Sequence, residues 1–177
     1  MALRNIVQEG DAILNKVCRP VTKFDDRLAT LLDDMQDTLT EAGGLGLAGP
    51  QVGMMRRLFI CEDLRVDTED WDARGKDFKP TYVEFINPEF LERSEDDLES
   101  SYEGCLSFPG YQALVKRPHR VKVRAQDRHG EFFEIEVEAL FARCIQHEND
   151  HIDGVTILES ADKLYKETRD GLEEVRK

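Results

Sequence analysis

The sequence predicts an α+β domain in which a mostly antiparallel sheet packs around one central helix. Apolar and polar residues alternate over Val121–Ala125 and again over Phe133–Val137, which predicts a β-hairpin with one solvent-exposed face. The segment from about Glu138 to Asp153 carries apolar side chains nearly all round a helix, a pattern typical of a buried helix. Strands that precede helices along the chain, rather than alternating with them, favour this fold class.

The composition is that of a mid-sized globular protein. With 177 residues, the chain is long enough to bury a hydrophobic core as a single domain spanning 1–177. Its formal net charge of −13 argues against nucleic-acid binding, because phosphates would be repelled. No apolar run reaches the roughly 18 residues of a membrane span, and residues 1–10 do not resemble a signal peptide. The four cysteines show no Cys-x-x-Cys spacing, which is typical of a reducing compartment, so we expect a cytoplasmic protein.

An amphipathic helix is expected in the N-terminal part of the chain. Between Asp25 and Ala42, leucines and other apolar residues recur on one stripe with the period of a helix. Asp25 and Asp26 suit the N-terminus of this helix, and Gly43 suits the position just after its end.

A glycine-rich stretch follows, with five glycines between Gly43 and Gly53 inclusive. Such a stretch cannot form a stable helix, and Pro50 interrupts any regular hydrogen-bond ladder. The composition allows another chain to approach the backbone closely. A phosphate-binding loop is one interpretation, but the lysine and the helix-opening glycine pattern of such loops are missing. A plain loop is the simpler alternative.

A buried strand is expected next at Leu58–Cys61, and another strand at Tyr82–Ile86, which ends at Asn87-Pro88. The acidic, turn-rich segment Glu62–Pro80 between them is interpreted as a long surface excursion. The polar stretch Glu92–Ser101 fits either an edge strand or a loop, and both interpretations stay open.

The C-terminal part follows the central helix after Gly154. We expect a short strand at Val155–Leu158 and a charged helix at Ala161–Arg176. No internal repeat is visible in the sequence.

The predicted central helix contains the pattern His147-Glu148-x-x-His151. Two histidines four residues apart lie on the same helical face, about 6 Å apart along the axis, so both imidazoles can reach one metal ion. Glu148 projects beside them and can accept a proton from water at that ion. The alternative is a pair of histidines and a glutamate on a solvated helix face.

A metal site of this kind needs a third protein ligand. Cys144 shares the face of the histidines, but it lies about 10.5 Å along the axis from His151, so its expected role is packing. A longer zinc-peptidase pattern continues through Gly154 and then fails, because Ile157 occupies its third ligand position. The downstream glutamates are Glu159, Glu167, Glu173 and Glu174.

Cys105 is the best candidate ligand from another segment. It lies between Gly104 and a Ser-Phe-Pro-Gly turn, a non-helical setting in which a thiolate can be presented to a metal. The alternative for an isolated cysteine is a small buried apolar residue. A closed four-ligand site would need one more cysteine or histidine, and Cys61, His119 and His129 have no recognisable spacing for it.

Three segments together resemble the signature motifs of the peptide deformylase family. They are Gly44-Leu45-Gly46-Leu47-Ala48-Gly49-Pro50-Gln51, Glu103-Gly104-Cys105-Leu106-Ser107 and Gln146-His147-Glu148-Asn149-Asp150-His151. The segments occur in the family's order and with its spacing, and the chain length agrees. Gly49 stands where the family usually has alanine, and Gly10 where it commonly has proline, whereas the catalytic and ligand positions are intact.

The resemblance implies a metal-dependent hydrolase that removes the N-formyl group from the starting methionine of nascent polypeptides and releases formate. The implied metal ligands are Cys105, His147 and His151. Glu148 is implied as the general base, which takes a proton from water and returns it to the leaving amine. Gln51 and the Leu106 backbone N–H are implied as donors that stabilise the developing oxyanion.

The resemblance also implies that the substrate peptide binds as an added strand, with backbone hydrogen bonds from Leu45 and Gly46 and with Gly104 opposite. An apolar pocket would hold the methionine side chain. The implied lining of this pocket is Leu45, Glu103, Leu140, Arg143, Cys144 and His147. We expect the Arg143 stem to line the pocket while its guanidinium reaches the rim.

The family favours Fe²⁺ as the metal, whereas the ligands alone suggest Zn²⁺; Ni²⁺ or Co²⁺ could also fill the site in purified protein. The implied partners are formyl-Met nascent peptides, with the ribosome surface as a further candidate and with no nucleic acid or membrane. We expect a monomer. The alternatives are a zinc peptidase that cuts internal bonds, which lacks a downstream ligand, and a closed metal-stabilised binding module, in which Glu148 would have no use.

Overall fold

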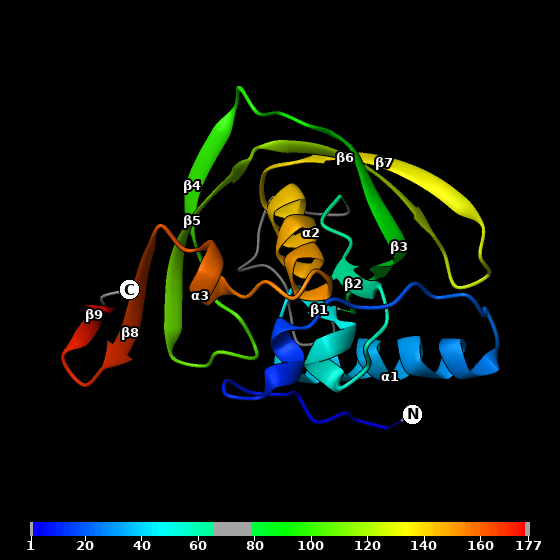
Figure 1. The fold of residues 1–177 in the computed structure, drawn as a ribbon, viewed down its shortest axis with the longest axis horizontal. Helices are drawn as coiled ribbons and strands as arrows, with labels where there is room; N and C mark the ends of the chain where they lie inside the picture. Colours follow the sequence, from blue (N-terminus) through cyan, green and yellow to red (C-terminus); the bar gives the residue numbers. More distant parts are fainter. Residues whose placement is uncertain (1, 66–78, 176–177) are drawn as a thin grey trace.

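The computed structural model describes residues 2–65 and 79–175 of the chain. Within these residues the strands form two antiparallel sheets, of order β1-β2-β3-β6-β7 and β4-β5-β8-β9 (Figure 1). The first sheet consists of β1 (Gly46–Ala48), β2 (Leu58–Glu62), β3 (Tyr82–Arg93), β6 (Arg120–Gln126) and β7 (Phe132–Glu138). The second consists of β4 (Leu98–Glu103), β5 (Tyr111–Pro118), β8 (Lys163–Thr168) and β9 (Gly171–Val175). The predicted α+β class is confirmed. Most of the acidic excursion expected at 62–80 lies outside the described residues.

Helix α2 (Ala139–Ile152) lies at the centre of the molecule, beneath the strands that arch over it (Figure 1). Most of its residues are buried, so the prediction of a buried central helix is confirmed. The other helices are α1 (Asp26–Ala42), α3 (Ile157–Ser160) and the short 3-10 helices η1 (Ala12–Asn15) and η2 (Gly49–Val52). Among the residues that the structure describes, no helix is both long and apolar enough to span a membrane.

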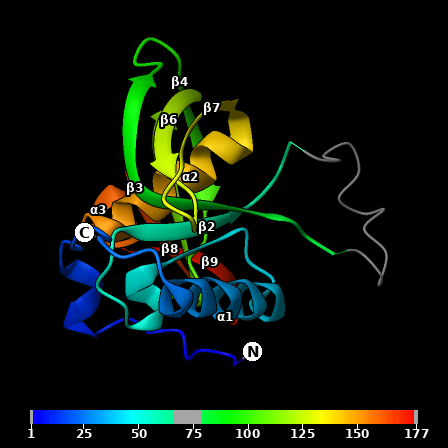
Figure 2. The same ribbon diagram turned by 90° about the vertical axis from the view of Figure 1, so that its right-hand side faces the viewer.

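Strand β2 lies between two of the three apolar clusters found among the described residues. Phe59 and Cys61 belong to the cluster that includes α2, whereas Leu58 and Ile60 belong to the cluster that includes α1. This division follows from the strand period of two, which directs successive side chains to opposite faces. Figure 2 shows β2 between the two helices. The predicted buried strand is confirmed, and both of its faces are covered.

Helix α1 begins and ends where the sequence predicted. The Asp25 side chain accepts a hydrogen bond from the Leu28 N–H at 3.1 Å, which satisfies one of the free donors of the first turn. Gly43 adopts φ 67°, the left-handed conformation that favours glycine, and its N–H closes the last turn on Leu39 O. The leucine stripe of this helix is buried against the first sheet.

The glycine-rich stretch forms β1 and η2 rather than a plain loop. Strand β1 pairs with β2, with Gly46 opposite Cys61 and Ala48 opposite Phe59. The close approach that the glycines were expected to allow is real at Gly49. A Cβ there would lie 2.7 Å from Met54 O, which is backbone and cannot give way easily.

Strand β3 continues past Asn87-Pro88, so the predicted end of the strand is wrong. A register shift between Ile86 and Glu89 forms a bulge, which accommodates the missing N–H of Pro88. Asn87 takes φ 50°, and its side-chain oxygen accepts the Val21 N–H at 2.8 Å. Of the open alternatives for 92–101, the structure has the end of β3, a turn and then the start of β4.

The C-terminal elements differ from the prediction. Helix α3 replaces the expected strand, because Thr156 and Glu159 form a capping box in which Glu159 Oε2 accepts the Thr156 N–H at 2.8 Å. The hairpin β8–β9 replaces the expected helix, and β8 pairs with β5, a strand that the sequence analysis did not assign. The turn consists of Arg169 and Asp170, and Gly171, at φ 120°, begins β9. The hairpin predicted at 121–137 is confirmed as β6–β7.

Candidate functional site

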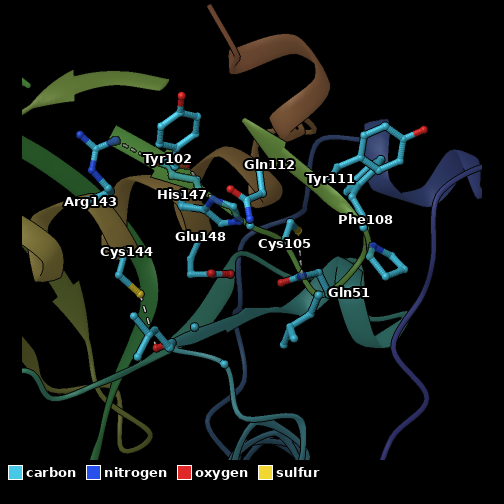
Figure 3. A pocket seen from close by; sticks show the side chains of 18 of the residues that line it. Gln51, Tyr102, Cys105, Phe108, Tyr111, Gln112, Arg143, Cys144, His147 and Glu148 are labelled. Atoms are coloured by element: carbon cyan, nitrogen blue, oxygen red, sulfur yellow. Dashed lines mark hydrogen bonds and ion pairs between the residues drawn. The ribbon is translucent and has the colours of Figure 1, made fainter. Parts of the chain in front are cut away.

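Three potential metal ligands meet between α2 and the turn that follows β4. The side-chain donor atoms of Cys105, His147 and His151 all lie within 4.8 Å of one another. The Cys105 Sγ lies 3.3 Å from His151 Nε2, and the two imidazole rings are 5.1 Å apart between centroids. Figure 3 shows Cys105, His147 and Glu148 directed into the same space. The structure therefore brings together the ligand set that the resemblance implied.

Local structure explains why these side chains converge. His147 and His151 stand one turn apart on α2, so they share its buried face. Cys105 begins a turn in which the Phe108 N–H donates to Cys105 O at 3.0 Å, and the buried Phe108 ring anchors that turn. The chain thus leaves β4 and immediately presents the thiol toward α2.

The donor set fits a divalent transition-metal ion. Two donors on one ion lie about 3 to 4 Å apart when their bonds are about 2.0–2.3 Å long, and the separation of Cys105 Sγ from His151 Nε2 meets this condition. Burial, together with the nearby His147, lowers the pKa of His151 well below its usual value. A neutral imidazole has a free lone pair, which is the form that binds metal.

Glu103 holds the His147 ring from behind. Glu103 Oε2 lies 3.0 Å from His147 Nδ1, which leaves Nε2 to face the other ligands. Arg117 donates two hydrogen bonds to the same carboxylate, from Nε to Oε1 at 2.6 Å and from Nη2 to Oε2 at 2.9 Å. Burial alone would raise the pKa of Glu103, but the hydrogen bonds with His147 and Arg117 outweigh it and hold the pKa well below its usual range. Glu103 is therefore an anion that fixes the orientation of the His147 ring.

The sequence analysis placed Glu103 only in the pocket wall and did not find Arg117. A carboxylate behind a metal-binding histidine is a common arrangement, so a glutamate two residues before Cys105 was a usable signal. Arg117 Nη1 also donates to Asp150 Oδ2 at 2.8 Å, which links β5 to α2. Nothing in the sequence pattern connects Arg117 with either carboxylate. The contact with Glu103 depends on the pairing of β4 with β5, and the contact with Asp150 depends on how the second sheet packs on α2.

Arg143 lies in the site, but not as expected. Its guanidinium is buried rather than directed to the rim. Nη1 donates to Glu103 Oε1 at 2.8 Å and to Val115 O at 3.0 Å, and Nη2 donates to Glu99 O at 2.8 Å. The buried carboxylate attracts the cation inward more strongly than the solvent at the rim. The expectation for the guanidinium is thus wrong, although Arg143 does line the cavity.

Glu148 is buried beside the ligands with one oxygen unused. Its Oε2 has no hydrogen-bond partner among the described residues. Burial raises the pKa of Glu148 to about 7, and the nearby His147 opposes this shift only in part. A carboxylate with a pKa near neutrality and a free oxygen is suited to accepting a proton and giving it back.

Gln51 and Leu106 present donors on the opposite side of Cys105. The Gln51 Oε1 accepts the Ala48 N–H at 2.9 Å, which fixes the orientation of the amide. Its Nε2 then points toward Cys105 Sγ at 3.6 Å and donates to Ser107 Oγ at 3.2 Å. The Leu106 N–H donates no hydrogen bond to any other residue within 2–65 and 79–175. Both groups can therefore donate to an oxygen placed near Cys105.

A cavity of about 530 Å³ opens onto this cluster, and every predicted site residue except His151 lines it. His151 is buried behind it. The predicted lining residues are Leu45, Gly46, Gln51, Glu103, Gly104, Cys105, Leu106, Leu140, Arg143, Cys144, His147 and Glu148. The cavity also extends past residues that the sequence analysis did not single out, including Tyr102, Tyr111, Gln112 and Glu167.

Comparison with known proteins agrees with this geometry. A family model described as polypeptide deformylase matches residues 3–167. A peptide deformylase of Clostridium botulinum (strain Alaska E43 / Type E3) is 47% identical over 163 residues, which covers 92% of this chain and 99% of that protein. The crystal structure of the Thermotoga maritima enzyme superposes with a TM-score of 0.79 at 37% identity, covering 92% of this chain and 99% of the other. A peptide deformylase from Synechococcus elongatus, solved with actinonin, gives a TM-score of 0.77 at 32% identity and covers 90% and 79%. The chain therefore belongs to the polypeptide deformylase family, metal-dependent hydrolases that remove the formyl group from the N-terminus of nascent polypeptides.

Proposed function

We propose that this deformylase carries out hydrolysis at a divalent metal ion held by Cys105, His147 and His151. The observation that supports the proposal most directly is Glu148, a buried carboxylate with one unpaired oxygen and a pKa of about 7, adjacent to the three donors. A closed structural site would have no use for such a group. Three protein ligands also leave a position on the ion for water or substrate.

Residues of the chain would transfer the protons and stabilise the developing negative charge during hydrolysis. The ion would supply Lewis-acid chemistry that makes the attacking water more acidic. Glu148 accepts the proton of that water as the C–O bond forms, and returns a proton to the amine as the formyl C–N bond breaks. Gln51 Nε2 and the Leu106 N–H donate to the formyl oxygen, where negative charge develops. The products are formate and a free N-terminal amine.

The two sheets offer the substrate peptide a place between them. Strand β1 ends the first sheet and β4 ends the second, so among the described strands each has a neighbour on one side only. An extended peptide can add to such edges through backbone hydrogen bonds. Leu45 and Gly46 would bond one side of the peptide and Gly104 the other. Backbone bonds do not depend on side-chain identity, which suits an enzyme that acts on many nascent chains.

The first side chain of the substrate, methionine, would enter the cavity next to α2. Leu140 lies at the rim, Cys144 and Leu45 form the apolar wall, and the stem of Arg143 completes it. The Glu103 carboxylate is occupied by two arginines, so it does not place an uncompensated charge beside the methionine. The part of the pocket wall that would contact the methionine side chain is therefore apolar.

We further propose Fe²⁺ as the native ion, with Zn²⁺, Ni²⁺ or Co²⁺ able to replace it. One thiolate and two imidazoles suit all four ions, so the donor set alone does not choose. We also propose that the chain acts as a single catalytic domain and a monomer in the cytoplasm, on formyl-Met nascent peptides at the ribosome surface. Its net charge of −13 disfavours a direct nucleic-acid contact.

Anaerobic purification with metal analysis, followed by a formate-release assay on formyl-Met-Ala-Ser, tests these proposals. We expect stoichiometric iron, activity that decays in air because oxygen reaches both iron and thiolate, and stable activity after exchange for Ni²⁺. Acetyl-Met-Ala-Ser should be hydrolysed poorly or not at all. Full activity in an air-stable zinc protein would contradict the assignment of iron, and equal rates on both peptides would contradict a site shaped for the formyl group.

A further inference from the structure

Two cysteines that the hydrolysis does not use are in contact behind the substrate cavity. Cys61 lies on β2 and Cys144 on α2, and their Sγ atoms are 3.3 Å apart. Both are free thiols. Cys61 is 0% exposed, whereas Cys144 is 7% exposed and lines the cavity (Figure 3). Only one member of the pair can thus be reached from outside.

The contact follows from the strand period and the helix position. Cys61 faces α2 because it alternates with Ile60, which faces α1. Gly46 of β1 lies opposite Cys61 in the sheet, and β1 is the edge strand to which we propose the substrate peptide adds. The cysteine pair is therefore next to that edge strand. The Cys144 thiol also donates to Leu45 O at 3.4 Å, which connects it to that same strand.

We propose that Cys61 and Cys144 form a modification site, a dithiol that a small-molecule disulfide entering through the cavity converts reversibly to an intramolecular disulfide. A disulfide bond is about 2.0 Å long, so the two sulfur atoms need to approach by only about 1.3 Å from their present contact. The route through the cavity rests on the proposed function, because that is where we place the methionine side chain.

The exchange balances as two successive substitutions at sulfur. Cys144 loses its proton and attacks one sulfur of the small disulfide, which releases one small thiol and leaves a mixed disulfide. Cys61 then loses its proton and attacks the Cys144 sulfur, which releases the second small thiol. The protein loses two protons and two electrons, equivalent to two hydrogen atoms, and the small disulfide gains them as it becomes two thiols. Cys144 reacts first because only its sulfur reaches the cavity, while burial raises the pKa of Cys61 and keeps it protonated.

The new bond would change the cavity wall. The Cys144 sulfur would move toward β2, so its hydrogen bond to Leu45 O would be lost on the side where Leu45 lines the cavity. The bond would also tie the metal-binding helix to β2. A reducing agent such as dithiothreitol would restore both thiols and the original wall.

The test uses full-length protein loaded with Ni²⁺, so that iron oxidation does not contribute and Cys105 is held as a ligand. The protein is incubated with excess 2-hydroxyethyl disulfide and analysed by intact mass and peptide mapping. We expect a loss of about 2 Da, a Cys61–Cys144 linkage, unchanged Ni²⁺ content and full reversal by dithiothreitol. Saturating Met-Ala-Ser, the product peptide, should slow the reaction several-fold.

Two variants control for the assignment. Cys61→Ala should stop at a lasting mixed disulfide on Cys144, because the second thiol is missing. Cys18→Ala removes another buried free cysteine of the same core cluster, one outside the 3.3 Å Cys61–Cys144 thiol contact, and it should behave like wild type. Cys61 is not among the residues that we place in catalysis or binding, so Cys61→Ala should keep its deformylase activity.

The wild-type mapping decides the proposal even if Cys61→Ala does not fold. A lasting adduct on Cys144, unmodified thiols, or a linkage to Cys18 or Cys105 would each overturn it. An oxidation rate unaffected by the product peptide would overturn the route through the cavity. These readouts need no turnover, so their failure is distinguishable from failure of the proposed catalytic roles, which the formate assay measures.

Discussion

Gly46 leaves the space that the Glu148 side chain fills. A Cβ at position 46 would lie 2.6 Å from Glu148 Cγ and 2.7 Å from its Cδ. Real Cβ atoms do not approach other heavy atoms so closely. Glu148, the proposed base, can therefore occupy this position only because residue 46 on the neighbouring strand has no side chain. Gly46 thus has a steric role toward Glu148 in addition to the backbone bonds that we propose it makes with substrate.

Gly46→Ala should displace Glu148 without disturbing the metal ligands. We expect kcat to fall by about 10²-fold, since a misplacement of about 1 Å at a catalytic group is sufficient for this loss. Gly104→Ala is the matched control for kcat, because it adds the same methyl group beside the proposed substrate strand at a place where a Cβ meets no protein atom within 4 Å; a contact with substrate there would change KM instead. Metal content should be normal in both variants. A Gly46→Ala enzyme with wild-type kcat would show that Glu148 tolerates the displacement.

Substitutions should separate the ligands from the base. Cys105→Ala, His147→Ala and His151→Ala should each lose the metal, because three protein ligands leave none to spare. Glu148→Ala should keep its metal and its fold while turnover falls by at least about 10²- to 10⁴-fold. Metal analysis and formate release on each variant make the distinction, with the exposed His129→Ala as a control that should retain both. A metal-free Glu148→Ala protein would identify Glu148 as a ligand.

Glu103→Gln should weaken metal binding although Glu103 does not touch the ion. The amide cannot accept as strongly from His147, and it removes one of the two carboxylates paired with the buried Arg117 guanidinium, which keeps only Asp150. We expect an affinity loss of about 10- to 100-fold, the usual effect of removing a partner behind a metal-binding histidine. Glu99→Gln is the control, because its side chain pairs with His119 at the surface. Competition with a metal-binding dye measures both.

The metal-free protein should lose stability as Glu148 ionises. Burial raises its pKa in the folded chain to about 7 from 4.5, so the folded state binds a proton that the unfolded state has released. The stability this provides is complete below pH 4.5 and declines as the pH rises to 7, by about 3 kcal/mol in total. Glu148→Gln cannot ionise and should avoid this decline.

Urea denaturation of the metal-free wild type and Glu148→Gln checks this prediction. The variant should have the larger free energy of unfolding at pH 8, and the difference should shrink toward pH 5. An equal difference at both pH values would mean that burial of the charge is not its cause. Other groups near the site titrate in both proteins, so their contributions largely cancel in the comparison.

The parts of the fold that the sequence predicted are those set by local patterns. The stripe and caps of α1, the buried face of α2 and the alternation in β6 and β7 depend on residues a few positions apart. The prediction of a helix over the β8–β9 segment was wrong. Its charged residues suit an exposed helix, but pairing with β5 overrides that preference. The bulge at Asn87 also depends on a distant partner, since Asn87 bonds the backbone of Val21.

The same distinction holds for the site. The histidine spacing and the family motifs located all the proposed ligands, the proposed base and 12 of the 20 residues that line the cavity. They did not predict that Glu103 bonds His147, that Arg117 joins it, or that the Arg143 guanidinium is buried. The contacts of Glu103 with His147 and Arg143 join elements far apart in sequence, which packing of the second sheet on α2 brings together. The contact with Arg117 depends on the pairing of β4 with β5, a strand that was not predicted.

Cys105 follows a strand of one sheet, and His147 and His151 stand on a helix packed against the other. An ion bound to all three would be a cross-link across the chain, and an unfolded chain offers no such preformed site. Its binding free energy is therefore also folding free energy. Lowering the supply of the ion in a cell would reduce more than turnover. Each molecule without the ion would spend more of its time unfolded, and proteases would degrade these molecules first.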